Sequence, residues 1–151
     1  MCGKRGCLLT VANSSALVSN ANRLRALPEY SSSGLNRVER VLSVMDVAIQ
    51  ADLGDPCACK AVDMIAIHIS KAISEIAEII NPNKLVLGGS LGYSCTYLVD
   101  RVREHMAGEF GDECHIISVE QAKLRQAASP LGAATLVLDR KAELLFYSDQ
   151  F

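Results

Sequence analysis

Two cysteines at the start of the chain have types and spacing that can bind a metal ion. Cys2 and Cys7 are separated by four residues, and a glycine stands next to each of them inside the loop. Glycine can adopt positive φ, so this short loop can turn both sulfurs toward one point. A structural zinc site needs four ligands, so the other two would come from upstream residues or from Cys57 and Cys59. The alternative is that Cys2 and Cys7 are ordinary buried thiols.

Cys57 and Cys59 are separated by one alanine. Residues two apart on a helix face different sides, so these thiols can share a metal only if their segment is a loop. Otherwise they are ordinary thiols. We find no signal peptide ahead of the six cysteines, so we expect a cytoplasmic chain whose cysteines are thiols or metal ligands.

A third candidate is the glycine pair Gly88 and Gly89, which follows the short apolar segment Lys84 to Leu87. Pro82 must end the preceding helix, and it favours an extended conformation at Asn81. The segment that follows is too short for a helix, and its apolar run favours a strand covered on both faces. Ligands of open α/β sheets bind at the carboxyl ends of strands, which makes the glycine pair a candidate ligand site. A tight strand-to-helix turn is the alternative.

Two of the histidines, His68 and His115, are weaker candidates for a metal-binding or catalytic role. His68 lies within a predicted helix with no carboxylate or second histidine at metal-ligand spacing, so we expect it at the boundary of the core. His115 alternates with apolar neighbours and has no visible base or nucleophile partner. We therefore expect a residue at the end of a strand.

Five helices and two strands must position these residues. The helices are predicted from Leu8 to about Leu27, from an Asn36 cap to about Leu53, from Cys59 to Ile80, from Cys95 to about Ala107, and from Pro130 onward. A core stripe in the second helix comprises Val38, Val41, Leu42, Met45, Ala48 and Ile49. The fourth helix is predicted to face the core with Leu98, Val99, Val102 and Met106. The strands are Lys84 to Leu87 and Cys114 to Val119, and with the intervening helix they form a right-handed parallel βαβ unit. Gly132 to Ala134 predict close packing of the last helix on the sheet, or close approach of a ligand.

Composition limits the functions to consider. The chain has 151 residues, of which 50% are hydrophobic and 21% charged, which is typical of one globular domain. No apolar run approaches the roughly 18 residues that span a membrane. The net charge of -2 gives no electrostatic footprint for nucleic acid, so a DNA-binding part would lie outside this chain. Because the sequence opens directly on the cysteine loop, we expect a fragment of a longer protein.

Three motifs together resemble the carboxyl-terminal half of the ROK family of sugar-responsive transcriptional repressors and sugar kinases. They are CGKRGCL at residues 2–8, NPNKLVLGG at residues 81–89 and LGAATLVL at residues 131–138. The motifs occur in the family's order with helices between them. The resemblance therefore covers nearly the whole chain.

This resemblance implies an actin-like, ribonuclease-H-like fold of two lobes with sugar bound between them. Residues 1–151 would be one α/β domain, a partial carboxyl-terminal lobe that is helix-rich and contains the parallel βαβ unit. The family's zinc motif is Cys-x-Cys-Gly-x-x-Gly-Cys-x-Glu with a histidine upstream, and Cys2 and Cys7 match its last two cysteines. Zinc binding is thus implied, with a site that is incomplete in this chain.

The chain departs from the family at two points. The family's glutamate two residues after the last cysteine contacts sugar hydroxyls, but this chain has Leu9 there, which cannot accept hydrogen bonds. The family's phosphate loop and catalytic aspartate also have no counterpart, so we assign no catalytic residue and expect no enzyme activity from the chain alone. In family kinases the glycine pair lies near the nucleotide. Gly88 and Gly89 would accordingly contact ATP in a kinase and be structural in a repressor.

Three alternatives for the function remain open. The first is the effector-binding and oligomerisation part of a ROK-type repressor, which senses a sugar or sugar phosphate and contacts DNA through a domain outside this chain. Residues 137–140 resemble the repressor branch. The second is the carboxyl-terminal part of an ATP-dependent sugar kinase, and the third a degenerate remnant without sugar activity. An open sheet edge further predicts that the isolated chain forms a homo-oligomer, namely a dimer, or is poorly soluble.

Overall fold

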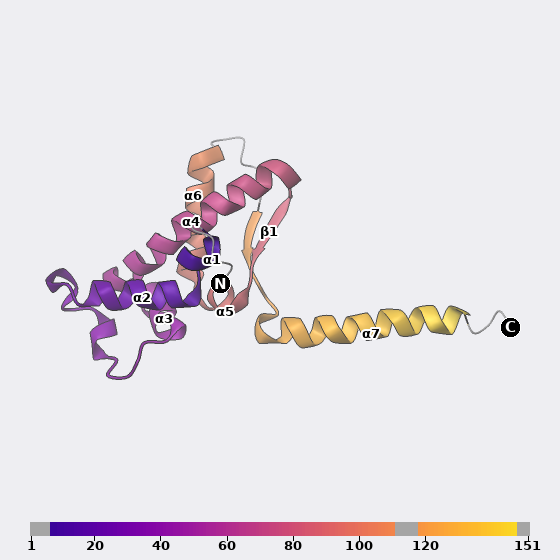
Figure 1. The fold of residues 1–151 in the computed structure, drawn as a ribbon, viewed down its shortest axis with the longest axis horizontal. Helices are drawn as coiled ribbons and strands as arrows, with labels where there is room; N and C mark the ends of the chain where they lie inside the picture. Colours follow the sequence, from indigo (N-terminus) through magenta and orange to yellow (C-terminus); the bar gives the residue numbers. More distant parts are fainter. Residues whose placement is uncertain (1–6, 111–117, 148–151) are drawn as a thin grey trace.

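The computed structural model describes residues 7–110 and 118–147, and Figure 1 shows a helical body from which one long helix extends. The α-helices are α1 (Leu8–Val11), α2 (Ser14–Arg25), α3 (Val44–Asp52), α4 (Pro56–Ile80), α5 (Gly89–Ser94), α6 (Thr96–Phe110) and α7 (Ala128–Tyr147). The strands are β1 (Lys84–Leu87) and β2 (Ser118–Gln121), and the short 3-10 helices are η1 (Pro28–Tyr30), η2 (Gly34–Arg37) and η4 (Arg125–Ala127).

Helix α4 is the central element of the core, and α2, α3 and α6 pack against it. The Asp55 carboxylate caps its first turn by accepting hydrogen bonds from the backbone N–H groups of Cys57 and Ala58, both at 3.0 Å. Pro56 occupies the first position, where its missing N–H costs nothing. The buried face includes Val62 and Ile65 at 0% exposure. The predicted third helix is therefore confirmed, with three more residues at its start.

The end of α4 corrects one detail of the prediction. Asn81 is not extended: it adopts the left-handed conformation, with φ 50 and ψ 58. Its N–H donates to the carbonyl of Ala77 at 2.8 Å, which satisfies one of the last free carbonyls of the helix. Asparagine tolerates this conformation better than other residues with a Cβ. The helix still ends before Pro82, as predicted.

The predicted first helix is divided in two. Chain direction changes at Ala12, and α2 begins after Asn13, whose side-chain oxygen accepts a hydrogen bond from the N–H of Ala16 at 2.7 Å. Asparagine is strongly preferred at the N-cap position. Its hydrogen bond with the Ala16 N–H starts a new helix here, and α1 does not continue.

The predicted second helix starts later than expected. Ser43, not Asn36, caps α3, through a capping box with Asp46. Because residues 38–43 are not helical, their apolar side chains do not form the predicted stripe. Val41 is 85% exposed, whereas Leu42 is buried. Within α3 itself, Ala48 is buried as predicted, but Met45 and Ile49 are about half exposed.

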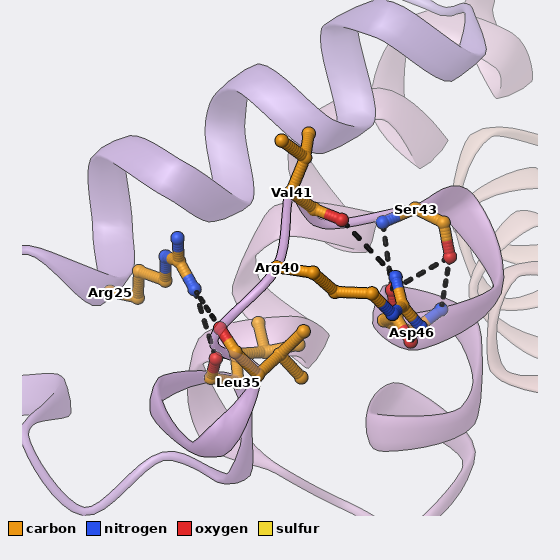
Figure 2. Close-up of polar contacts among 7 residues, drawn as sticks. Arg25, Leu35, Arg40, Val41, Ser43 and Asp46 are labelled. Carbon is orange, nitrogen blue, oxygen red and sulfur yellow. Dashed lines mark hydrogen bonds and ion pairs between the residues drawn. The ribbon is translucent and has the colours of Figure 1, made fainter.

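Charged side chains hold this non-helical segment in place (Figure 2). The Arg40 guanidinium makes two hydrogen bonds to the Asp46 carboxylate, at 2.7 and 2.8 Å. One Arg25 nitrogen donates to the carbonyl of Leu35 at 3.0 Å and approaches that of Val38 at 3.5 Å. Helix α2 and the start of α3 thus anchor both ends of the loop.

The two strands form the predicted βαβ unit. Strands β1 and β2 pair in parallel, with Lys84 opposite Ser118 and Leu87 opposite Gln121, and α6 lies between them in the sequence. Four residues of α6 predicted to face the core are buried, namely Leu98, Val99, Val102 and Met106. Residues 114–117 of the second predicted strand, including His115, lie outside the described residues.

The expectation that β1 is covered on both faces is wrong for this chain. Val86 is 57% exposed, whereas Leu85 and Leu87 on the other face are partly buried against the helical core. Within the described residues the sheet has two strands, and the helices cover one of its faces.

Helix α7 begins directly after η4, past the carboxyl end of β2, and extends away from the body (Figure 1). Pro130 lies in its first turn, as predicted. The predicted close packing at Gly132 to Ala134 is wrong: these residues are exposed, and a Cβ added at Gly132 would meet nothing within 4 Å. Leu136, Val137 and Leu138 are also 65–72% exposed.

No helix in the described part of the chain is long and apolar enough to cross a membrane.

Candidate ligand site at the Gly88–Gly89 turn

The glycine pair forms the turn between β1 and α5. Gly88 is extended, and Gly89 has φ +70, a conformation that side chains with a Cβ rarely adopt. Helix α5 then folds back against the strand end, and a Cβ at Gly92 would lie 2.6 Å from the backbone carbon and oxygen of Leu87. Gly89 therefore allows the turn, and Gly92 allows the close contact that follows it.

A cavity of about 250 Å³ lies between this turn and the start of α2. Its polar lining comes from Asn13, Ser14 and Ser90, and its apolar lining includes Ile69 and Leu98. The Ser14 and Ser90 hydroxyl oxygens are 3.4 Å apart although the residues are 76 positions apart in sequence. This volume is below the roughly 300–1,000 Å³ typical of small-molecule pockets, so it suits a phosphate or part of a sugar.

The same sheet edge also brings β2 to this turn. The N–H of Ala122, just after β2, donates to the carbonyl of Leu87 at 3.0 Å. A Cβ at Gly88 would be 3.9 Å from the Ala122 Cβ. The carboxyl ends of both parallel strands thus meet beside the glycine turn, and it is at such strand ends that open α/β sheets bind ligands.

A larger groove of about 600 Å³ runs between α2 and the loop before α3. Ser14, Ser15, Ser19, Asn22 and Ser43 supply its polar lining, so Ser14 lines both the groove and the cavity. The groove is lined by neither glycine of the predicted site and by no strand residue, so we take the cavity at the glycine turn as the candidate site.

The structure describes one of the two predicted zinc ligands. Cys2 lies outside the described residues, and Cys7 is partly exposed just before α1. The Cys7 carbonyl accepts hydrogen bonds from the Thr10 N–H at 2.8 Å and from the Thr10 hydroxyl at 2.6 Å, which fixes its backbone. Among the described residues no group of three or more histidine, cysteine, aspartate or glutamate side chains could hold a metal ion.

Cys57 and Cys59 do not converge. Both lie in the first turn of α4, where the Cys57 thiol faces the carbonyl of Ala21 in α2 and the Cys59 thiol faces that of Ala51 in α3. Burial raises the pKa of each thiol above its ordinary value. Because the segment is helical, the geometry supports the interpretation of Cys57 and Cys59 as ordinary thiols.

Leu9 is the residue at which the resemblance leads us to expect a glutamate. It lies on α1, and its side chain is 70% exposed. It does not line the candidate cavity.

A polar network that the sequence did not predict holds the start of α6 against α3. The Asp52 carboxylate, at the end of α3, accepts hydrogen bonds from the N–H groups of Thr96 at 3.2 Å and Tyr97 at 2.7 Å. Asp52 therefore caps α6 from another helix. Burial raises the pKa of the adjacent Cys95 thiol to about 11, and the Asp52 charge contributes. No sequence spacing indicates this contact, because its partners are more than 40 positions apart.

A second part of the network joins α4 to α6. The Asp63 carboxylate accepts hydrogen bonds from Arg101 Nε at 2.8 Å and from the Tyr97 hydroxyl at 3.2 Å. Burial and the Asp63 charge both raise the pKa of Tyr97. These contacts hold α6 against the central helix α4. His68, which was predicted at the boundary of the core, is instead exposed on α4.

The ROK family model matches residues 1–140. The glucokinase of Halalkalibacterium halodurans is 33% identical over 105 residues, which are 69% of this chain and 32% of the glucokinase. The kanosamine kinase of Amycolatopsis mediterranei is 25% identical over 136 residues, which are 90% of this chain and 41% of the kinase.

Solved structures share the fold. A ROK family glucokinase from Streptomyces griseus, in complex with glucose and AMPPNP, superposes with a TM-score of 0.77 at 24% identity, covering 89% of this chain and 45% of that protein. A ROK family transcriptional regulator, a homologue of the E. coli MLC protein, superposes with a TM-score of 0.66 at 28% identity, covering 85% of this chain and 32% of that protein.

The chain spans less than half the length of these relatives, which include both kinases and a transcriptional regulator. Its helix-rich body and small parallel sheet correspond to part of the actin-like fold of ROK sugar kinases. The match over residues 1–140 leaves 11 of 151 residues outside the family model. The chain belongs to the ROK family.

Proposed function

We propose that this chain is the effector-binding and oligomerisation part of a ROK-type, sugar-responsive transcriptional repressor, without catalytic activity of its own. The observation that carries this proposal is the lining of the cavity at the Gly88–Gly89 turn, where the two glycines are structural and Asn13, Ser14 and Ser90 supply the polar side chains. Its described lining consists of hydroxyl, amide, backbone and apolar groups and contains no acid, base or thiol. Such groups can hydrogen-bond to a ligand, but none can act as a general base at neutral pH.

Leu9 supports the non-catalytic assignment. An aliphatic side chain in place of the family's glutamate removes a charged acceptor for sugar hydroxyls. Hydrogen bonds to charged groups contribute about 1.5–3 kcal/mol each, so the sugar contacts of a family kinase would be weakened here. A sensor can function with weaker binding because it does not need to align a hydroxyl for phosphoryl transfer.

The competing candidate is the carboxyl-terminal part of an ATP-dependent sugar kinase. The glucokinase and kanosamine kinase relatives favour it. Under this alternative, Gly88 and Gly89 would contact ATP, and a phosphate loop and a catalytic aspartate would come from a region outside this chain.

The proposal includes three partners. A sugar or sugar phosphate is the effector, and DNA would be contacted only through a domain outside this chain. A second copy of the chain would complete a homodimer. The exposed apolar residues of α7 and the open face of β1 at Val86 support the last point, because apolar surface of this kind favours association.

Zinc belongs to the proposal only in a longer protein. Cys2 and Cys7 would supply two thiolate ligands, and a tetrahedral structural site needs two more. The described residues do not complete such a site. Elemental analysis of a longer protein that contains this chain should find close to one zinc per copy, and less than about half an equivalent would remove the ligand role of both cysteines.

Ligand binding and turnover can be measured on the same protein. We expect a sugar or sugar phosphate in excess to raise the melting temperature of the purified chain, since a ligand that binds the native state stabilises it. A coupled assay with MgATP and the same sugar should detect no ADP release. Sugar-dependent ADP release would instead support the kinase.

Serine variants locate the binding. Ser14→Ala and Ser90→Ala should each weaken ligand binding about fivefold, because each removes about one neutral hydrogen bond. Ser32→Ala is the matched control, since this serine is exposed in a loop away from the cavity. Weakening by Ser14→Ala alone would place the ligand in the groove, which Ser14 also lines. An affinity equal to that of the parent in all three variants would place the ligand outside both.

A further inference from the structure

A basic crevice of about 540 Å³ lies at the carboxyl end of β2. Its lining is Arg103 from α6 together with Glu120, Gln121, Ala122, Lys123 and Arg125 from the end of β2 and the turn that follows. Neither the family motifs nor the proposed function assigns a role to these side chains.

The carboxylate of the crevice is already neutralised. Glu120 pairs with Lys84 on the neighbouring strand at 2.7 Å. Arg103 is fixed against the wall, because its Nε donates to the carbonyl of Val119 at 2.7 Å and its Nη1 pairs with Asp100 at 2.7 Å. Within the described residues, Lys123 and Arg125 form no ion pair, and both are exposed. The crevice therefore carries positive charge that its own carboxylate does not balance.

The backbone of Arg125 is strained. Its φ of +48 lies in the left-handed region, which costs energy for a residue with a Cβ. The residue is exposed, so burial of its side chain does not offset this cost. Strained backbone conformations cluster at functional sites, where the position of the side chain is needed for a purpose other than stability.

The crevice adjoins the candidate ligand site. Ala122 lines the crevice, and its N–H is bonded to the carbonyl of Leu87, the residue before Gly88. A ligand whose uncharged part occupies the cavity at the glycine turn can therefore extend an anionic group toward Lys123 and Arg125. A cluster of lysine and arginine side chains beside hydrogen-bonding groups is chemically suited to a phosphate.

We propose that the crevice formed by Arg103, Lys123 and Arg125 binds the phosphate group of a small phosphorylated ligand. The ligand class rests on the proposed effector-binding function, but binding of phosphate by the crevice does not. A sugar phosphate and a nucleotide share this chemistry, and the experiment distinguishes them.

Isothermal titration of the full 151-residue chain tests the proposal with inorganic phosphate, glucose 6-phosphate, glucose and ADP. We expect inorganic phosphate to bind, and the ligand that also fills the neighbouring cavity to bind more tightly. Tighter binding of glucose 6-phosphate than of ADP identifies a sugar phosphate, and the reverse order a nucleotide. Absence of phosphate binding at low ionic strength, where charge attraction is strongest, overturns the proposal.

Two charge-removing variants and a matched control make the test specific. Lys123→Gln and Arg125→Gly should each weaken phosphate binding about tenfold, because each removes a charge-assisted hydrogen bond. Lys71→Gln removes the same charge from an exposed position on α4 and should leave binding unchanged. If Lys71→Gln weakened phosphate binding equally, the effect would be due to the net charge of the protein, and the assignment to the crevice would be overturned.

Arg125→Gly also separates binding from folding. Relief of the left-handed strain should raise the melting temperature by about 3 °C while phosphate binding falls. A variant that is more stable and binds phosphate as well as the parent would overturn the proposal. If phosphate binds and no sugar or sugar phosphate does, the result supports phosphate binding by the crevice and contradicts the effector-binding function. If sugars bind and phosphate does not, the result supports the effector-binding function and contradicts phosphate binding by the crevice.

Discussion

At the scale of single residues, the sequence pointed to the glycine turn and missed the carboxylates that hold the helices together. Gly88 and Gly89 were predictable because a strand between proline and glycine has few alternatives. Asp52, Asp55 and Asp63 were not, because each receives hydrogen bonds from elements distant in sequence. The types of these residues are ordinary, and only the tertiary fold gives them partners.

Asp55 illustrates how one carboxylate joins two elements. Besides capping α4, it accepts hydrogen bonds from the Ser33 hydroxyl at 2.9 Å and the Gly34 N–H at 2.7 Å. Burial alone would raise its pKa, but these hydrogen bonds together lower it below the ordinary value. The carboxylate thus remains ionised and fixes the loop containing η2 against the central helix.

Asp46 gives a pH-dependent prediction at this scale. Hydrogen bonds from Arg40 and Ser43 lower its pKa from 3.8 to about 2. Because the folded-state pKa is lower, the ionised form stabilises the fold above about pH 4, and this contribution is lost as the pH falls toward 2. We expect Asp46→Asn to lower the free energy of unfolding by about 1 kcal/mol at pH 7 in urea titrations.

The difference between Asp46→Asn and the parent should shrink between pH 4 and pH 2. Asp139→Asn on the exposed α7 is the control and should stay within about 0.5 kcal/mol of the parent at pH 7. A difference for Asp46→Asn that is unchanged at low pH would show that ionisation of Asp46 does not stabilise the fold.

At the scale of elements, the sequence predicted the central helix, the βαβ unit and the four buried residues of α6. These have strong periodicity or clear proline and glycine boundaries. The second helix was misplaced because its apolar residues continue through a segment that is not helical. The competing signal was Ser43 followed by Asp46, a capping box that stops the helix from extending toward Asn36.

Glycines in two helices give a prediction for this scale. Gly92→Ala should lower the free energy of unfolding by about 1–3 kcal/mol, because the new Cβ would lie 2.6 Å from the backbone of Leu87. Gly108→Ala in α6 meets nothing within 4 Å and should raise it by about 0.5–1 kcal/mol through helix propensity. Urea unfolding measures both, and a neutral Gly92→Ala would mean that α5 can move away from the strand end.

At the scale of the whole molecule, the family was accessible from three motifs, whereas the placement of the last helix was not. Its small residues suggested packing on the sheet, yet α7 extends away from the body (Figure 1). Small side chains permit close packing but do not specify the surface that provides it. In the described part of this chain no other element covers the small residues of α7, and they remain exposed.

Association in solution follows from this exposed surface. Leu136, Val137 and Leu138 on α7 and Val86 on β1 are all more than half exposed. We expect light scattering to find a dimer or larger species for the isolated chain. Replacing Leu136 and Leu138 by glutamate should shift the population toward monomer, because charges disfavour an apolar contact. A monodisperse monomer of the unaltered chain would contradict the oligomerisation part of the proposed function.

The measurement that tests the central claim most directly is an NMR titration of the isotope-labelled chain with glucose 6-phosphate, following backbone amide signals. The account predicts that the signals of Gly88, Gly89, Ser90 and Ser14 shift together and saturate at one ligand concentration. Shifts confined to the groove beside Ser19, Asn22 and Ser43, with the glycine signals unmoved, would contradict it.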